Sequence, residues 1–273
     1  MVNLMQNLLK LSLCLALPLL AQSPPAAAPD LRRAESRPIN ESVAEDPAIL
    51  KAIEPAQKEI LAGFGKVIAT APNGVFRGRG GEENLLGYWI ADCMRSRASA
   101  QVGAPVRFAF TNGGGIRGNI KAGDVKVGDV FEVMPFENEM MVIELTGAEV
   151  AAVMRESFRR RGGEPSSGIK AGLSGTPEKP EFKITWEDGT AIAPDELVKV
   201  ATSDYLYGGG DSYPTLKKGR RPYTTGLTIR QILLDTCQEL GKAGKPLLPP
   251  TGGRYSIPPE FIQAIRDKKL VLP

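Results

Sequence analysis

The sequence predicts one mixed α/β domain of the α+β kind, with helices packed on layered mixed sheets, and three observations support this fold class. Segments with helical spacing of apolar residues and short apolar runs typical of strands follow each other after residue 46. The 273 residues are 42% hydrophobic and 24% charged, which is typical of a soluble globular protein. No internal repeat and no second linker divides this part of the sequence.

The first 23 residues are predicted to be an export signal. Lys10 precedes an apolar run at residues 11–20, and small residues follow, with cleavage expected near residues 21–28. The apolar run is too short to span a bilayer. Cys14 follows a leucine rather than the small residue that a bacterial lipobox needs, so lipid anchoring is not expected. We therefore expect an exported protein, in the periplasm or outside the cell.

The globular domain is expected to begin after a linker. Residues 24–46 are rich in alanine, proline, serine and charge, and this composition predicts a flexible linker. The domain is then expected to span residues 47–273. Its first element is a predicted helix at residues 47–62, which Pro55 kinks or divides. A short strand at residues 65–69 is expected next.

A loop that carries Arg77 and Arg79 leads to the best-supported helix. Residues 84–98 place apolar side chains and Cys93 on one helical face. Residues 106–111, Val-Arg-Phe-Ala-Phe-Thr, form an apolar run that predicts a strand. Helices and strands therefore already alternate in the first half of the domain.

The middle of the chain contains two predicted strands and a helix. Residues 120–128 are a turn-rich connection, and residues 130–134 are expected to be a strand. A second strand is predicted at residues 140–146. The helix predicted at residues 147–160 starts near Thr146 and ends in a run of arginines that favours the negative pole of the helix.

The C-terminal third contains a predicted strand pair. Residues 182–186 and 197–203 alternate between apolar and polar, and the Asp188-Gly189 turn lies between them, so we expect them to pair. The segment before them, residues 162–179, is expected to be a loop. The remaining predicted elements are a helix at residues 227–240, a strand at 254–257 and a short helix at 259–268.

Charge and cysteine content narrow the function classes. The net charge is only +3 and the basic residues are scattered, so nucleic-acid binding is not expected. The basic cluster at residues 217–221 is equally well explained as a solvated loop. Cys93 and Cys237 lie on predicted amphipathic helices, which favours two small buried hydrophobes, although an exported protein would also permit a disulfide.

The chain contains no histidine. Zinc sites, dimetal phosphoesterase sites and Ser-His-Asp hydrolase sites depend on imidazole, so these mechanisms are excluded in their usual forms. Sites for Mg²⁺ or Ca²⁺ built from carboxylates alone remain open. No cofactor is expected in this chain.

A glycine loop directly after the strand at residues 106–111 is the first candidate site. Three glycines lie between Asn112 and Ile116, and Arg117 follows. Glycines such as Gly114 let backbone amides approach a ligand closely, while the amide and guanidinium side chains offer several hydrogen bonds. The loop also fits the pattern G-x-G-x-x-G, but the residues after it make a poor helix, which argues against a dinucleotide motif.

Three further segments carry residues that suit the same small molecule. Phe136 and Tyr205 offer flat faces on which a nucleobase can stack. Asp211, in a second glycine loop, can accept hydrogen bonds from ribose hydroxyls. Each residue alone also has an ordinary structural explanation as a core, turn or surface residue.

In combination, these segments resemble the C-terminal domain of the 5'-nucleotidase family. The resemblance covers about residues 47–257 and rests on motifs in matching order: Leu86-Gly87 to Asp92, Asn112 to Arg117, Gly123-Asp124, Pro135-Phe136-Glu137-Asn138, Leu145-Thr146-Gly147, and Tyr205 to Tyr213. It implies a domain that binds the nucleoside part of a substrate. Phe136 and Tyr205 match the two rings that stack on the base, Asp211 matches the ribose-binding carboxylate, and Asn112 and Arg117 match polar contacts.

The sequence departs from the family pattern in two respects. Glu82 and Glu83 stand where the family often has an arginine, for which Arg77 or Arg79 is a candidate replacement, and Tyr88 replaces the usual asparagine. The histidine-containing metallophosphatase domain of the family is also not recognisable in this sequence. We therefore expect a separate metallophosphatase chain to hold the divalent metals, and we do not expect this chain to hydrolyse nucleotides alone.

Three other functions remain open at this point. The chain could be a stand-alone nucleoside- or nucleotide-binding or sensing protein without a catalytic partner. A degenerate fold kept for structural purposes conflicts with the intact candidate residues. Independent hydrolysis would need an all-carboxylate metal site that the sequence does not reveal.

Overall fold

The computed structural model describes residues 38–78 and 83–272, and the chain divides into two units at Leu50 and Lys51. The predicted signal, part of the predicted linker, Arg79 and Glu82 lie outside the described residues. In the first unit, helix α1 (Pro47–Phe64) begins where the Asp46 carboxylate accepts the N–H of Ala48 at 2.8 Å.

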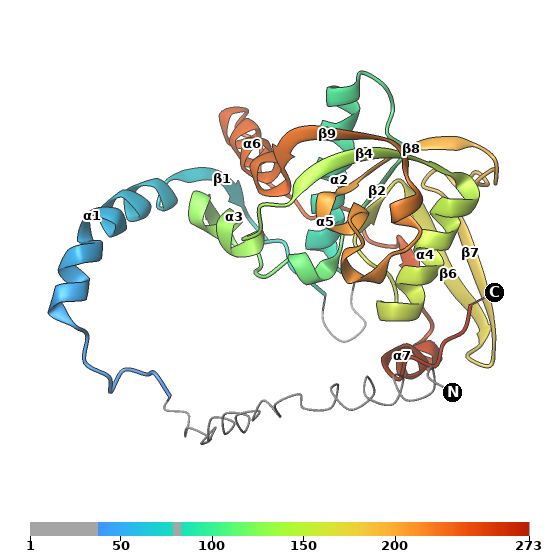
Figure 1. The fold of residues 1–273 in the computed structure, drawn as a ribbon, viewed down its shortest axis with the longest axis horizontal. Helices are drawn as coiled ribbons and strands as arrows, with labels where there is room; N and C mark the ends of the chain where they lie inside the picture. Colours follow the sequence, from blue (N-terminus) through green and yellow to red (C-terminus); the bar gives the residue numbers. More distant parts are fainter. Residues whose placement is uncertain (1–37, 79–82, 273) are drawn as a thin grey trace, which may run out of the picture. The chain divides into compact units, whose positions relative to one another are not determined.

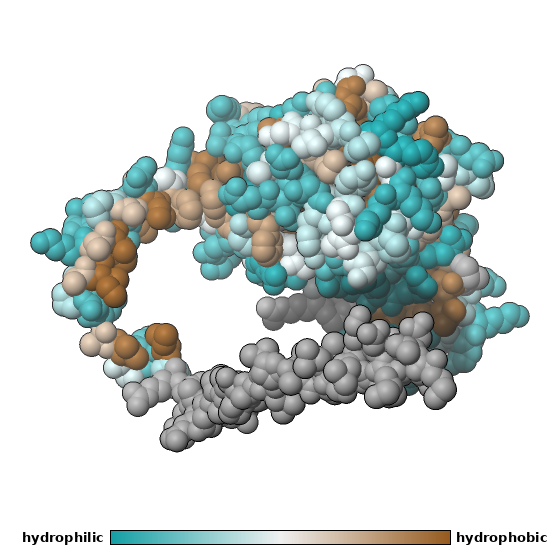
Figure 2. Space-filling model, viewed as in Figure 1, coloured by the Kyte–Doolittle hydropathy of each residue, from teal (hydrophilic) through white to brown (hydrophobic). Residues whose placement is uncertain are grey.

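The predicted first helix is confirmed, and it continues through Pro55 as a single element. None of its residues is buried, and apolar side chains such as Ile53, Ile60 and Leu61 are exposed. Figure 2 shows hydrophobic residues in brown along this helix. At its C-terminal end, the Phe64 ring lies 4.6 Å from the Phe131 ring.

A five-stranded sheet forms the centre of the second unit (Figure 1). Its strand order is β5 (Ser166–Ser167), β2 (Phe108–Phe110), β8 (Leu197–Ser203), β4 (Glu139–Thr146) and β9 (Arg220–Thr228). Only the β2–β8 pair is parallel, so the sheet is mixed. The predicted strands at residues 106–111, 140–146 and 197–203 are confirmed.

Helices and a second sheet cover the two faces of the central sheet. Helices α2 (Leu85–Val102) and α6 (Ile229–Lys242) pack on one face. Helix α4 (Gly147–Arg161), helix α7 (Pro259–Arg266) and the sheet of β6 (Ile169–Thr176), β7 (Lys179–Trp186) and β10 (Tyr255–Ser256) pack on the other. Because Val142 belongs to the first core and Ile143 to the second, strand alternation fills both cores.

Side-chain caps fix the helix starts that the sequence predicts. The Asn84 side chain accepts the N–H of Gly87 at 2.8 Å before α2, and Thr146 accepts that of Glu149 at 3.2 Å before α4. The Glu149 carboxylate in turn accepts the N–H of Thr146, which completes a capping box. The mixed α/β fold class is confirmed.

The predicted strand at residues 130–134 is wrong, because this segment belongs to helix α3 (Val127–Val133). The Asp129 carboxylate accepts the N–H of Lys126 at 2.6 Å and stabilises the helix start. Val130, Val133 and Met134 are buried with helical spacing, whereas Glu132, which a strand would place on the same face as Val130 and Met134, is exposed.

The predicted pairing of residues 182–186 with 197–203 is also wrong. Strand β7 pairs with β6, from Ile169 opposite Trp186 to Thr176 opposite Lys179, and β8 lies in the central sheet between β2 and β4. The turn at Asp188-Gly189 therefore leads from one sheet into the other. The segment expected to be a loop, residues 162–179, supplies the missing partner β6.

Two further strands differ from the sequence prediction. Strand β3 (Gly123–Lys126) lies in the segment expected to be a turn-rich connection, and it pairs with β1 (Val67–Ala71). Strand β9 includes Arg220 and Arg221 of the basic cluster at residues 217–221, for which a solvated loop was an equally good explanation. The backbone of Arg220 pairs with Glu144 of β4, and its guanidinium forms an ion pair with Glu149 at 2.8 Å.

The two cysteines are buried in the core around α2 and α6. Cys93 and Cys237 are both free thiols and 8% and 0% exposed, so their interpretation as small buried hydrophobes is confirmed. Among the described residues, no helix is both long and apolar enough to cross a membrane.

Candidate functional site

The glycine loop begins where β2 ends in the central sheet. Asn112 is 7% exposed, and the next three residues, Gly113–Gly115, form a single 3-10 turn. The chain then continues in extended form, and the Arg117 N–H donates to the Val133 carbonyl at 2.8 Å. No helix opens at this loop, so the prediction that it is not a dinucleotide motif is confirmed.

Asn112 lies directly against the second glycine loop. Its Nδ2 donates to Asp211 Oδ2 at 2.7 Å, although the two residues are 99 positions apart. The Tyr205 hydroxyl lies 3.3 Å from Asp211 Oδ1 and also accepts the backbone N–H of Asp211 at 3.3 Å. Asp211 has a left-handed backbone with φ of 50°, which is unfavourable for a non-glycine residue and is maintained by these contacts.

The two predicted stacking residues, Phe136 and Tyr205, present partly open rings. Their exposed fractions are 40% and 43%, which is high for aromatic side chains. Arg117 lies over the Phe136 ring, with its guanidinium carbon 5.2 Å from the ring centroid. Tyr205 packs against Gly210, where a Cβ atom would overlap the ring. No contact joins the two rings in the described structure.

The six predicted site residues therefore form two groups connected by one loop. Asn112, Tyr205 and Asp211 are joined by hydrogen bonds, and Arg117 is joined to Phe136. Because Asn112 and Arg117 begin and end the same glycine loop, both groups are held by it. The sixth predicted residue, Gly114, lies between them, close to the Asn112 amide and the Arg161 guanidinium.

Sequence analysis did not identify Glu164 and Arg161 as residues that contact these loops. Glu164 accepts the N–H of Gly113 at 2.6 Å and the hydroxyl of Tyr213 at 3.3 Å, and Arg161 Nε lies 3.4 Å from the same carboxylate. Burial raises the pKa of Glu164, while the Gly113 hydrogen bond and Arg161 act in the opposite direction. A glutamate within a Gly-Gly-Glu-Pro segment carries no periodic signal that would have predicted its burial.

Arg77, Glu83 and Tyr88, which lie where the sequence departs from the family pattern, form hydrogen bonds in the structure. Arg77 Nη2 donates to the Gly113 carbonyl at 3.4 Å, so Arg77 does reach the glycine loop. Glu83 accepts the N–H of Gly253 and the hydroxyl of Tyr88, at 2.7 and 3.2 Å. These bonds anchor the segment before β10 to the start of α2.

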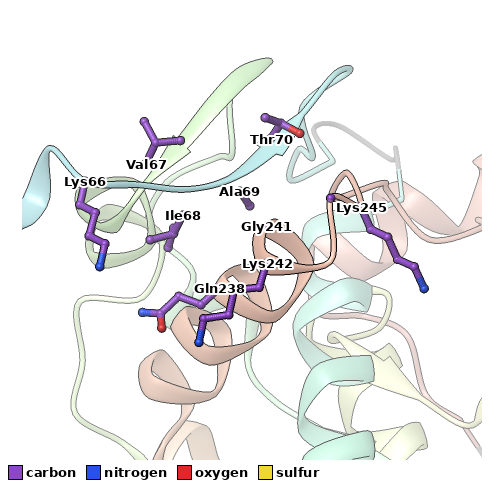
Figure 3. Close-up of a pocket in the computed structure, with 10 residues that line it drawn as sticks. Lys66, Val67, Ile68, Ala69, Thr70, Gln238, Gly241, Lys242 and Lys245 are labelled. Atoms are coloured by element: carbon purple, nitrogen blue, oxygen red, sulfur yellow. The ribbon is translucent and has the colours of Figure 1, made fainter.

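Two cavities of the domain differ in their position relative to the glycine loop. One, of about 400 Å³, borders the glycine loop and is lined by residues that include Arg77, Gly113, Arg161 and Glu164. The other, of about 570 Å³, lies between β1 and the end of α6 (Figure 3). Its lining includes Lys66, Lys242 and Lys245, and lysines at the C-terminal end of a helix are expected on electrostatic grounds. Neither of these two cavities is lined by any of the six predicted site residues.

Within residues 38–78 and 83–272, no group of three or more histidine, cysteine, aspartate or glutamate side chains is arranged to hold a metal ion. The Asp211 carboxylate, beside the glycine loop, is held by hydrogen bonds within the protein. Asn112 and Tyr205 already engage the two oxygens of Asp211. Together the loops offer hydrogen-bonding groups and two partly exposed ring faces.

The fold and these loops define a class of protein: a mixed α/β domain that brings polar and aromatic residues together from separate loops. Residues 67–218, more than half of the chain, match the family model for the 5'-nucleotidase, C-terminal domain. The chain therefore belongs to the 5'-nucleotidase C-terminal domain family.

Individual relatives agree with this assignment. The chain is 33% identical over 177 residues to the trifunctional nucleotide phosphoesterase protein YfkN of Bacillus subtilis, a match that covers 60% of this chain and 12% of YfkN. It is 32% identical over 149 residues to the cell wall protein Lmo0130 of Listeria monocytogenes, covering 50% of this chain and 19% of that protein.

Solved structures give the same result. The crystal structure of a 5'-nucleotidase precursor from Thermus thermophilus superposes with a TM-score of 0.65 at 25% identity, covering 77% of this chain and 43% of that one. This chain thus spans less than half the length of each of these proteins.

Proposed function

We propose that this chain is a substrate-recognition domain that binds the nucleoside part of a nucleotide. In this proposal the base stacks between Phe136 and Tyr205, and Asp211 accepts hydrogen bonds from the ribose hydroxyls. Asn112 orients Asp211, while Arg117 and the Gly114 backbone offer further donors. The observation that carries the proposal is the hydrogen-bonded group of Asn112, Tyr205 and Asp211, together with the partly open rings of Phe136 and Tyr205, which are 40% and 43% exposed.

The hydrolytic step is proposed to come from a metallophosphatase that works with this domain. The relative YfkN is named a nucleotide phosphoesterase, and the chain itself has no histidine to build the usual dimetal site. The partner would supply divalent metals and an activated water, and this domain would orient the substrate. The proposed role is therefore in nucleotide breakdown.

A second proposed function is binding or sensing without catalysis. The absence of histidine favours it as well, since a binding protein needs no metal centre. The two functions differ in one measurable respect. Phosphate release from AMP should rise when this chain is added to a metallophosphatase encoded beside it, whereas a pure binding protein would compete for AMP and lower the rate.

Export to the periplasm or cell exterior is proposed from two observations. The N-terminal residues have the composition of a signal, and one relative is named a cell wall protein. Fractionation of cells that express the full chain, followed by mass spectrometry of its N-terminus, tests this location. Uncleaved chain in the cytoplasm would contradict it.

Calorimetry with adenosine and AMP tests the recognition function. The double variant Phe136→Ala/Tyr205→Ala is expected to bind at least about tenfold more weakly, because stacking contributes about 1–3 kcal/mol per base. Tyr223→Ala is a matched control, since Tyr223 is 45% exposed on β9 and is not among the proposed site residues. Unchanged affinity in the double variant would overturn the site assignment.

A further inference from the structure

Glu164 is a buried carboxylate for which the proposed function has no role. It lies between α4 and β5 and is 2% exposed. Both of its oxygens accept hydrogen bonds, Oε2 from the Gly113 N–H at 2.6 Å and Oε1 from the Tyr213 hydroxyl at 3.3 Å. One side chain thus joins a main-chain donor and a phenol from segments that are far apart in the sequence.

The two partners of Glu164 belong to the two loops of the candidate site. Gly113 directly follows Asn112, and Tyr213 lies two residues after Asp211. The same loops are also joined directly by the hydrogen bond from Asn112 to Asp211. The loops are therefore connected twice, once through the candidate ligand-binding residues and once through Glu164.

Gly113 is suited to this connection because it lacks a side chain. A Cβ atom at this position would lie 3.1 Å from Glu164 Oε2, which is closer than nine in ten real Cβ contacts. A larger residue would push the carboxylate away from the loop. The glycine that begins the 3-10 turn thus permits the short hydrogen bond to Glu164.

We propose that Glu164 is a positioning residue, which holds the glycine loop and the Asp211 loop at the separation that a ribose requires. This inference rests on the proposed nucleoside-binding function. Glu164 acts through Gly113 and Tyr213 and does not touch the ligand itself.

The chemistry of the position favours this role over simple filling of space. Burial of a carboxylate is unfavourable unless its oxygens are hydrogen-bonded, whereas a leucine would occupy a similar volume without that cost. A leucine, however, would accept neither the Gly113 N–H nor the Tyr213 hydroxyl. Tyr213 is itself fully buried, so loss of its acceptor would leave a polar group without a partner.

Three variants separate positioning from general stability. Glu164→Leu removes both acceptors, whereas Glu164→Gln keeps an acceptor for Gly113 and a polar partner for Tyr213. Tyr213→Phe removes only the hydrogen bond between Tyr213 and Glu164. It replaces the leucine variant if that variant does not fold. Glu178→Leu, an exposed glutamate between β6 and β7, is the control. Calorimetry measures binding of adenosine and of adenine, which lacks the ribose.

We expect Glu164→Leu to weaken adenosine binding about tenfold and to weaken adenine binding much less, because Asp211, which is proposed to hold the ribose, lies on a loop that Glu164 positions. Glu164→Gln should bind adenosine within about threefold of the wild type. Without ligand, hydrogen exchange of backbone amides in residues 112–117 and 209–213 should accelerate together in Glu164→Leu. Tyr213→Phe should give a smaller change in the same direction.

Wild-type adenosine affinity and wild-type loop exchange in Glu164→Leu would overturn the proposal. An equal loss of adenosine and adenine binding, or a glutamine variant as weak as the leucine variant, would also overturn it. If the wild type binds neither ligand, the proposed function fails. Exchange then still decides the role of Glu164: acceleration in both loops supports it, and unchanged exchange contradicts it.

Discussion

Asn112 Nδ2 donates to Asp211 Oδ2 at 2.7 Å and joins the end of strand β2 to a loop 99 residues later. The other Asp211 oxygen, Oδ1, lies 3.3 Å from the Tyr205 hydroxyl. A carboxylate has about four acceptor positions, so each oxygen keeps one for a ligand. Asp211 can therefore accept two ribose hydroxyls while both hydrogen bonds remain.

This hydrogen bond predicts coupling between Asn112 and Asp211 in ligand binding. Asp211→Ala and Asn112→Ala are each expected to weaken adenosine binding about tenfold, because each removes a charge-assisted hydrogen bond. Since Asn112 acts by orienting Asp211, the double variant should lose less than the product of the two effects. Calorimetry on the four proteins checks this, with Asp195→Ala, on the exposed β7–β8 connection, as control. Fully multiplicative losses would show that the residues act independently.

Gly210 predicts how the Tyr205 ring is held. A Cβ atom at this position would lie within 2.6 Å of three Tyr205 ring atoms, so Gly210→Ala must displace the ring. Because Tyr205 is 43% exposed, the ring can move into solvent at a cost of about 1 kcal/mol in the free energy of unfolding. Adenosine binding should fall about tenfold, since stacking is lost.

Gly63→Ala is the matched control for this change. No heavy atom lies within 4 Å of a Cβ at Gly63, and the residue is helical, so alanine should stabilise the protein by about 0.5–1 kcal/mol without changing adenosine affinity. Denaturant titrations and calorimetry measure both quantities. Normal adenosine binding by Gly210→Ala would argue against a stacking role for Tyr205.

The buried cysteines predict thiols that do not react in the folded protein. Burial raises the pKa of Cys237 to about 12 and also raises that of Cys93, so neither is a thiolate near neutral pH. Iodoacetamide at pH 8 should leave both unmodified within an hour and should alkylate both in urea. Mass spectrometry of the peptides that contain each residue checks this. Rapid labelling of the native protein, or a disulfide-linked peptide pair, would contradict the prediction.

The sequence predicts elements that carry a clear local pattern. Helix α4 was expected because Thr146 caps a segment with helical spacing, and strand β4 was expected from its apolar run. The strand prediction for residues 130–134 was wrong because this run is short. Five residues with valines at the first and fourth positions fit a strand and a helix about equally. The helical form of this segment depends on the local cap between Lys126 and Asp129 and on burial against α6, and only the burial is a tertiary contact.

Strand pairing was less predictable than strand existence. Residues 182–186 and 197–203 are both strands, but their partners are set by the packing of two sheets on α4, which no local turn signal encodes. In the site, the residue types on the loops suggested Asn112 and Asp211 separately. Their direct hydrogen bond and the contribution of Glu164 depend on how loops far apart in the sequence meet.

Glu164 predicts a specific dependence of stability on pH. Burial raises its pKa in the folded protein above the ordinary value of 4.5, and the nearby Asp211 charge acts in the same direction. Arg161 on α4 and the Gly113 hydrogen bond oppose this shift but do not reverse it, while Tyr213 donates to the carboxylate and Tyr255 to the Glu164 carbonyl. The folded state therefore binds this proton more tightly than the unfolded state does.

The stability that comes from this raised pKa is fully present below pH 4.5 and is lost as the pH rises through the folded-state pKa. Glu164→Gln cannot ionise, so it lacks this dependence. The difference in free energy of unfolding between wild type and Glu164→Gln should therefore shift in favour of the variant as the pH is raised through this window. Urea titrations of both proteins from pH 4 to pH 8 measure this difference. The subtraction removes the contributions of all other groups that titrate identically in the two proteins. A difference that stays constant with pH would mean that the pKa of Glu164 is not raised in the folded protein. A difference that shifts toward the wild type would mean that its hydrogen bonds stabilise the charged form more than burial opposes it.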